Sequence, residues 1–285
     1  MLFDLHLHTN FSDGELPPAE LIAFVRGHGV RVAAVTDHDT LAGLAAAMEA
    51  GTRQDVAVIP GIELTTHLQG TEVHILGLGI DPADRDLRRL AVQLKTARLM
   101  RLKRILARLR DQGVMIHDRD VFAAADLMAG TETVTAYGRP HIARVLCARG
   151  YADTYRDAFE RFVGNACPAY LPKAEYPALT AIQLVKKAGG VAILAHPENT
   201  LTEAGIDQLA AGGLDGIEVY CPAHDEMLTY HYEVMARTKG LLVTAGTDLH
   251  SPKGYELKLA GLTHTAGILD GLRPRLPQVP ALAAP

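Results

Sequence analysis

Histidines and carboxylates gather at short spacing in this chain of 285 residues. The first group follows Asp4 in the run DLHLHT, where His6 and His8 lie two positions apart. Because side chains alternate between the two faces of a β-strand, both imidazoles leave the same face and could bind one metal ion. This motif is short enough to occur by chance, so two hydrogen-bonded core histidines are an equal alternative for the pair alone.

Similar residues follow other predicted strands. His38 lies in the run TDHD, Glu63 in GIEL and His196 in AHP, and Asp248 and His250 both lie in GTDLH. A further histidine, His74, lies inside the predicted strand EVHIL. In a barrel of parallel strands, the carboxyl ends of the strands meet on one rim, where enzymes of this architecture carry their sites. One metal cluster would explain all of these residues, whereas structural roles would need a separate reason for each.

The elements that must position these residues follow from the hydrophobic pattern. Short apolar, β-branched runs predict strands over 2–8, 31–36, 56–61, 72–79, 191–195, 216–220 and 241–245. Amphipathic patterns between them predict helices over 18–28, 41–54, 179–188 and 223–239. Alternating strands and helices predict an α/β fold with a parallel sheet covered by helices. Seven strands favour a (β/α) barrel over a small doubly wound sheet.

The alternation stops between 81 and 172, where the pattern is helical only and opens with a long helix over 82–112. Removing 111–169 as a helical insertion leaves a length close to the ~250 residues of a typical barrel. We therefore expect a first barrel part over 1–110, an inserted substrate cap over 111–169, and a second barrel part with a C-terminal tail over 170–285.

Charge counting favours more than one ion. With Asp13, which follows the first strand, the candidate ligands are His6, His8, Asp13, His38, Glu63, His74, His196, Asp248 and His250. Nine ligands exceed what one ion can use. Two divalent ions against three carboxylates leave about +1, and three ions leave about +3. Either cluster would attract an anion, which points to phosphate esters.

Composition excludes several other classes. Cys147, Cys167 and Cys221 form no CxxC pair, which argues against a disulfide framework and thiolate metal sites. The formal charge of −5 does not suit a protein that coats duplex nucleic acid. The N-terminus lacks the pattern of a signal peptide, and no apolar run reaches the ~20 residues of a membrane span. We expect a cytoplasmic protein.

These motifs together resemble the polymerase and histidinol phosphatase (PHP) domain family, which is related to the amidohydrolases. The resemblance rests on DLHLHT, TDHD, AHP and GTDLHS and on the positions of Glu63 and His74, and it extends from Met1 to about Gly261 outside the insertion. It implies a distorted seven-stranded TIM-like barrel with two or three Mn²⁺, Zn²⁺ or Fe²⁺ ions, of which Mn²⁺ is our expectation.

Carried over by position, the family pattern assigns a role to every candidate ligand. The first ion would be held by His6, His8, Glu63 and Asp248. Glu63 would bridge to a second ion, held also by His74 and His196. Asp13, His38 and His250 would hold the third. Asp13, His196 and Asp248 are the predicted catalytic residues, acting through a hydroxide that the metal activates.

Stand-alone members with a helical insertion are the most similar branch. They imply a metal-dependent phosphatase that removes the 3′-phosphate of a 3′,5′-nucleoside bisphosphate. Alternatives are a cyclic-nucleotide or oligonucleotide phosphodiesterase similar to a 5′-3′ exoribonuclease, a histidinol-phosphate phosphatase, and an amidohydrolase. A non-catalytic metal-binding scaffold is the alternative from another class. We expect a small phosphorylated partner, and the sequence leaves the oligomeric state open.

The candidate substrate contacts are basic and aromatic residues of the long helix, of the insertion and of the barrel rim. Ten Lys or Arg residues fall between 85 and 110, where a solvated helix face is the ordinary interpretation, and Arg101 and Arg104 are candidates to reach substrate. The run TAYGRPH is typical of a helix start that could bind phosphate. It and its neighbours supply further candidates: Tyr137, Gly138, Arg139, Lys173 and His224.

Overall fold

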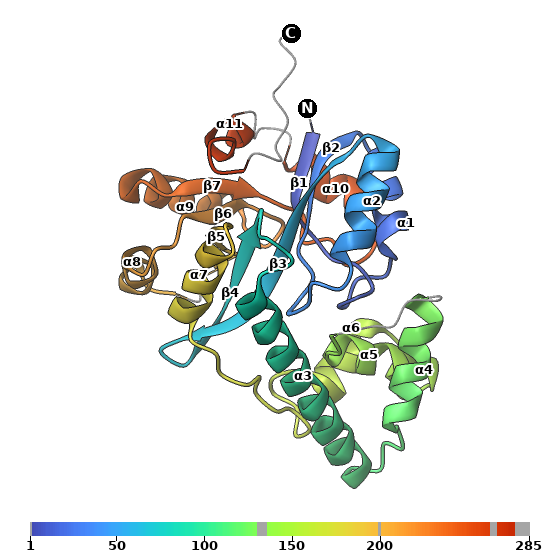
Figure 1. The fold of residues 1–285 in the computed structure, drawn as a ribbon. Helices are drawn as coiled ribbons and strands as arrows, with labels where there is room; N and C mark the ends of the chain where they lie inside the picture. Colours follow the sequence, from blue (N-terminus) through green and yellow to red (C-terminus); the bar gives the residue numbers. More distant parts are fainter. Residues whose placement is uncertain (1, 130–135, 199–200, 263–266, 277–285) are drawn as a thin grey trace.

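A computed structural model describes residues 2–129, 136–198, 201–262 and 267–276 (Figure 1). Its seven strands form one sheet in chain order. They are β1 (Leu2–Leu7), β2 (Val30–Val35), β3 (Ala57–Leu68), β4 (Thr71–Leu78), β5 (Val191–Leu194), β6 (Gly216–Tyr220) and β7 (Leu242–Ala245). The α/β class and all seven predicted strands are thereby confirmed, and the last residue of β1, Leu7, also bridges to Leu249 beyond β7.

The prediction of a wholly parallel sheet is wrong at β4. This strand runs antiparallel to both neighbours, β3 and β5, while the other neighbouring pairs are parallel. The cause is a tight turn at Gln69 and Gly70, where both residues have positive φ, a conformation that joins two strands as a hairpin. The third strand therefore continues to Leu68 instead of ending at Gly61.

One set of helices packs against the sheet and forms the main hydrophobic core with it. It comprises α1 (Pro18–Gly27), α2 (Leu44–Gln54), α7 (Ala178–Lys187), α8 (Glu203–Ala211), α9 (Glu226–Lys239), α10 (Tyr255–Ala260) and α11 (Ile268–Leu272). Helix α8 was not among the predicted helices. Its buried side chains are Ile206 and Leu209, too few to give a clear helical period.

A second set of helices lies to one side of the sheet and has its own hydrophobic core (Figure 1). It comprises α3 (Arg85–Asp111), α4 (Asp118–Ala129), α5 (Arg139–Ala148), α6 (Tyr155–Ala158) and a π-helical turn, η1 (Phe159–Val163). Helix α3 belongs to both cores, because Leu87 and Leu94 pack on the main core and Leu102 and Leu109 on the second. The change of core thus falls inside α3, before the predicted boundary at 111.

Between 81 and 172, the described residues form no strand, as predicted. The last part of the predicted C-terminal tail, from 277 onward, lies outside the described residues. None of the helices in the described part of the chain combines the length and apolar character that crossing a bilayer requires.

Candidate metal centre

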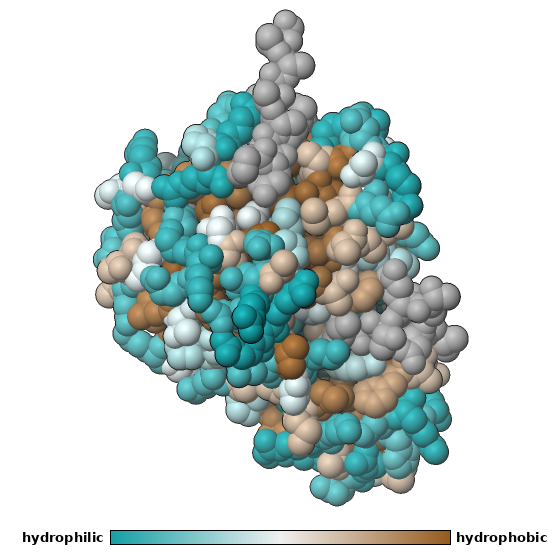
Figure 2. Space-filling model, in the orientation of Figure 1, coloured by the Kyte–Doolittle hydropathy of each residue, from teal (hydrophilic) through white to brown (hydrophobic). Residues whose placement is uncertain are grey.

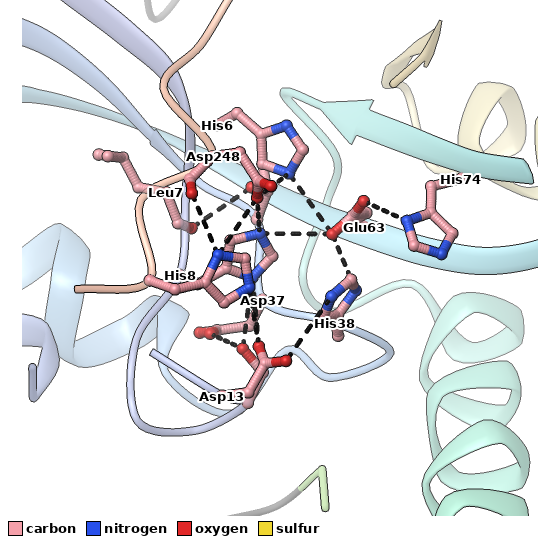
Figure 3. A network of polar contacts seen from close by, with 12 residues as sticks. His6, Leu7, His8, Asp13, Asp37, His38, Glu63, His74 and Asp248 are labelled. Carbon is pink, nitrogen blue, oxygen red and sulfur yellow. Dashed lines mark hydrogen bonds and ion pairs between the residues drawn. The ribbon is translucent and has the colours of Figure 1, made fainter. Parts of the chain in front are cut away.

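The fold brings the nine predicted ligands together, although they come from six separate parts of the chain. Glu63, from the middle of β3, lies between the others (Figure 3). One of its oxygens, Oε1, is 2.7 Å from Nδ1 of His74 and 3.1 Å from Nε2 of His196. The other, Oε2, is 2.8 Å from Nδ1 of His38. A single carboxylate is therefore shared by several imidazoles.

Asp248 and Asp13 extend this cluster in a second direction. Oδ1 of Asp248 is 3.1 Å from Nε2 of His8 and 3.4 Å from Nε2 of His6. Oδ1 of Asp13 is 3.1 Å from Nε2 of His250. Three sets of residues each place their ligand atoms within 4.8 Å of one another: His6, His8, Glu63 and Asp248; His8, Asp13, His38 and His250; and His38, Glu63 and His74.

The first set matches the residues expected for the first ion, and the second set adds His8 to those expected for the third. The third set contains Glu63 and His74, as expected for the second ion, together with His38. His196 contacts Glu63 but does not belong to that set.

The donor atoms have the properties of metal ligands. Six of them are buried and make no well-formed hydrogen bond, so that their close contacts are with one another or with other ligands: Nε2 of His6, Nε2 of His8, Oδ1 of Asp13, Nδ1 of His38, Oε2 of Glu63 and Oδ1 of Asp248. Buried polar atoms without a partner are costly in a folded protein. Divalent cations would satisfy these imidazole and carboxylate donors together, so the residues fit a metal cluster.

The electrostatics of the cluster favour ionised carboxylates. Burial alone would raise the pKa of Glu63, but the neighbouring His38 and His74 hold it well below its usual range. The pKa of Asp248 is likewise held low against burial, chiefly by His250. Although burial opposes it, Asp13 and Asp248 together raise the pKa of His250 to about 10.

A buried acid behind the ligands escaped the sequence analysis. Glu218, inside β6, has an oxygen 3.1 Å from Nδ1 of His6 and accepts a hydrogen bond of 3.0 Å from the backbone N–H of His196. It is fully buried. A side chain at Gly246 would clash with His6 and Glu218, so glycine is required there. The only sequence signal was a charged residue within the apolar run GIEVY.

Replacing Glu218 with Gln is expected to weaken metal binding and activity by about 10- to 100-fold, because groups that orient metal-bound histidines have effects of that size. One oxygen of the Glu218 carboxylate contacts Nδ1 of His6, and the other accepts a hydrogen bond from the backbone N–H of His196. A glutamine side chain has only one acceptor oxygen, so it can keep only one of these two contacts. Metal content measured after dialysis tests this. The matched change Glu226→Gln, at the exposed start of α9, is the control. Wild-type metal affinity in Glu218→Gln would contradict the prediction.

Two further acids fix the loops that carry the ligands. Asp37 accepts hydrogen bonds from the backbone N–H (2.8 Å) and hydroxyl (2.6 Å) of Thr9, in the loop after β1. Asp4 accepts from the backbone N–H (2.9 Å) and hydroxyl (2.6 Å) of Thr247, in the loop after β7. Some polar residues of the runs DLHLHT and TDHD are therefore candidate ligands, whereas others, such as Asp4 and Asp37, stabilise the loops that carry the ligands by hydrogen bonds.

Two of the predicted substrate-binding residues lie beside the cluster. Arg139, the first residue of α5, lines a cavity of about 400 Å³ with His74 and His196. Its guanidinium donates to the side chain of Asn165 at 2.7 Å. Lys173 donates to Glu72 at 2.8 Å, and that carboxylate lies 3.1 Å from Nε2 of His74.

The remaining candidates lie elsewhere. Tyr137 packs against Phe122 in the second core, with ring centroids 4.9 Å apart, a packing role rather than a position in the cavity. Gly138 is the N-cap of α5. His224 stacks on Tyr232 and lines a different cavity.

The basic run of α3 is mostly solvated. Arg104 is exposed and lines neither of the cavities next to the cluster. Arg101 is half-buried and donates to the carbonyl of Leu171 at 2.7 Å. Burial and the nearby charge of Arg139 lower the pKa of Arg101 to about 10. Figure 2 shows hydrophilic residues over the start of α3 and hydrophobic residues farther along it, and Val92 and Met100 of this helix are exposed.

A second cavity, of about 790 Å³, adjoins the cluster at Asp13 and His250. It is also lined by Arg144, Tyr155 and Lys253, none of which the sequence analysis singled out. The candidate centre therefore borders two cavities, one at His74 and His196 and the other at Asp13 and His250.

An α/β fold with buried imidazoles and carboxylates beside such cavities is the arrangement of a metal-dependent hydrolase. The family model that matches is the PHP domain, over residues 4–163. The chain is 32% identical to the 3′,5′-nucleoside bisphosphate phosphatase of Chromobacterium violaceum, covering 87% of each chain. It is also 32% identical to a 5′-3′ exoribonuclease of Haemophilus influenzae, covering 89% of this chain and 91% of that one.

Among solved structures, a protein of Bifidobacterium adolescentis named as a metal-dependent phosphoesterase has a TM-score of 0.81 and 34% identity, covering 87% of each chain. The chain belongs to the PHP domain family, and the predicted resemblance is confirmed. It is a metal-dependent phosphoesterase.

Proposed function

We propose that this enzyme removes the 3′-phosphate of a 3′,5′-nucleoside bisphosphate. The observation that carries the proposal is Arg139, which lines the 400 Å³ cavity together with His74 and His196 of the candidate centre. A substrate with two phosphates could place one at the centre and the other against this guanidinium. The name of the relative from Chromobacterium violaceum supports this substrate class.

We propose that two or three divalent ions, of which Mn²⁺ is expected, bind the nine residues of the cluster. The proposed ligands are His6, His8, Asp13, His38, Glu63, His74, His196, Asp248 and His250. Bound ions would lower the pKa of a water molecule and neutralise charge that develops on the phosphate oxygens. The donor set fits this role because it combines six imidazoles with three carboxylates.

The chain's own residues would orient the substrate and the ligands. Arg139 can form two parallel hydrogen bonds with the second phosphate, since a guanidinium matches two phosphate oxygens. Glu72 lies 3.1 Å from Nε2 of His74 and accepts a hydrogen bond from Lys173. The contact with Glu72 orients the His74 imidazole so that its Nδ1 faces Glu63. Lys173 thereby acts on the centre through Glu72 and adds positive charge beside the cavity.

The finer description of the fold belongs to the same proposal. We propose that the sheet forms a distorted barrel, supported by the bridge between Leu7 and Leu249. We also propose that the helical segment over 111–169 caps the active site. This is supported by Arg139 and Asn165, which it contributes to the smaller cavity.

Phosphate release tests the proposed function. With Mn²⁺ added, adenosine 3′,5′-bisphosphate should be hydrolysed to AMP and phosphate more efficiently than histidinol phosphate or adenosine 3′-monophosphate. A preference for histidinol phosphate, or shortening of a dinucleotide without phosphate release from the bisphosphate, would contradict the proposal.

Arg139→Met should raise KM for the bisphosphate by about 10- to 100-fold, because hydrogen bonds to charged groups contribute about 1.5–3 kcal/mol. It should change KM for adenosine 3′-monophosphate little, since that substrate lacks the second phosphate. The exposed Arg156→Met is the matched control. Equal effects of Arg139→Met on both substrates would argue against a second-phosphate site.

A further inference from the structure

Two arginines reach from the second set of helices to loops that carry candidate ligands. Arg98 lies on α3 and Arg144 on α5, and both side chains are largely buried. Neither figured among the predicted site residues, and neither belongs to the nine ligands. Each contacts a different loop, and both loops contribute to the same set of ligands.

Arg98 is bound to the residue that follows His38. Its Nε donates a hydrogen bond to Oδ2 of Asp39, and its Nη2 donates to the hydroxyl of Thr65 at 2.9 Å. Oδ1 of Asp39 accepts a hydrogen bond of 2.8 Å from the backbone N–H of Thr65. The ion pair therefore joins helix α3, strand β3 and the loop after β2.

The conformation of Asp39 matters for the position of His38. Asp39 has a φ of 55°, in the left-handed region that non-glycine residues adopt only when their surroundings hold them there. Its backbone N–H donates to the carbonyl of Glu63 at 2.9 Å. This bend leaves Nδ1 of His38 2.8 Å from Glu63 and its Nε2 3.9 Å from Asp13. Arg98 stabilises the side chain on which the bend depends.

Arg144 holds the other loop. Its Nη2 donates a hydrogen bond of 2.9 Å to the backbone carbonyl of Asp13. The same helical segment makes a second contact with this loop, where the N–H of Ala136 donates to the carbonyl of Phe11 at 3.1 Å. The position of Asp13 is therefore coupled to helix α5, although Asp13 follows β1 in the sequence.

Asp13 and His38 both belong to the set that also contains His8 and His250. We propose that Arg98 and Arg144 are positioning residues for the ion bound by this set, so that its affinity depends on helices α3 and α5. Neither arginine donates a hydrogen bond to a residue of the set of His6, His8, Glu63 and Asp248, although Asp39, which Arg98 holds, donates to the backbone carbonyl of Glu63. The inference rests on the metal ligation proposed above, and it does not depend on which phosphate ester is hydrolysed.

Mn²⁺ titration of the full-length protein, followed by electron paramagnetic resonance, tests the proposal. Arg98→Met and Arg144→Met should each raise the Kd of one class of Mn²⁺ site by about 10- to 100-fold, the range for groups that orient metal ligands. The change should be smallest at the site of His6, His8, Glu63 and Asp248, which contains neither Asp13 nor His38. At low Mn²⁺ kcat should fall with the occupancy of the weakened site, and excess Mn²⁺ should restore it.

Conservative variants separate positioning from folding. Arg98→Lys and Arg144→Lys keep the charge but lose the planar group, and should lie between wild type and the Met variants. Asp39→Asn keeps the size of the side chain and should reproduce the selective loss seen in Arg98→Met. Arg149→Met is the matched control, because Arg149 is an exposed arginine at the C-cap of α5 that pairs with Asp120, and this variant should bind Mn²⁺ as wild type does.

Two results would overturn the proposal. One is wild-type Kd values for every site in both Met variants. The other is an equal weakening of all sites together with a lower melting temperature in the Lys and Asn variants, which would show a general structural role. If wild type binds Mn²⁺ but does not hydrolyse nucleotides, the proposed function fails while this inference is still tested by the Kd values.

Discussion

Replacing Glu63 with Gln should lower kcat/KM by about a thousandfold or more. Its two oxygens lie next to His38, His74 and His196, and it belongs to two of the three ligand sets. An amide keeps the shape but loses the charge and one acceptor oxygen. Metal ions supply several kcal/mol of transition-state stabilisation, and each 1.36 kcal/mol corresponds to a factor of ten in rate.

The measurement is phosphate release at saturating Mn²⁺, with metal content determined on the same preparation. Glu49→Gln, a surface change on α2 that removes only an exposed pair with Arg53, is the matched control and should be fully active. Activity of Glu63→Gln within tenfold of wild type, with a full complement of metal, would show that the cluster is not organised around Glu63.

Removing the metal from wild-type enzyme should have an effect of similar size on activity. Dialysis against a chelator should abolish phosphate release, and Mn²⁺ should restore it. Removal should also lower the melting temperature, because a ligand present at 100 times its Kd contributes about 2.7 kcal/mol to stability. The buried donor atoms without hydrogen bonds explain this second effect, since they lose their proposed partner.

Thermal unfolding with and without Mn²⁺ measures the change in stability, and the Glu63→Gln variant serves as its control. That variant should gain less in melting temperature on adding Mn²⁺ than wild type does. Unchanged activity and melting temperature after the protein has been shown to be free of metal would contradict a catalytic role for the cluster.

The candidate ligands could be selected from the sequence alone. His6 and His8 share a strand face because side chains alternate with a period of two, and this holds whatever surrounds the strand. The other ligands follow, or in the case of His74 lie inside, apolar runs that could be identified as strands from their composition. Local pattern therefore predicted the strands and most of the ligand positions at their ends, whereas the structure places Glu63 in the middle of β3, and the PHP resemblance assigned the ligands to ions.

The direction of β4 depended on a turn that the pattern did not reveal. Gln69 and Gly70 adopt positive φ and turn the chain back on itself, whereas alternating strands and helices predicted a parallel neighbour. His74 consequently reaches Glu63 from an antiparallel strand. A two-residue turn can reverse a strand with little change in its hydrophobic pattern, so composition alone did not distinguish the two cases.

Tertiary structure also decided which polar residues contact the candidate ligands and the loops that carry them. Glu218 differs from other acids only in being buried behind His6, and Arg98 and Arg144 differ from neighbouring arginines only in the loops that they reach. Arg104, one helical turn beyond Arg101, is exposed. Residue type and spacing limit what a side chain can bind, but its partner depends on segments that are distant in the sequence. Only the packing of those segments brings the partners together.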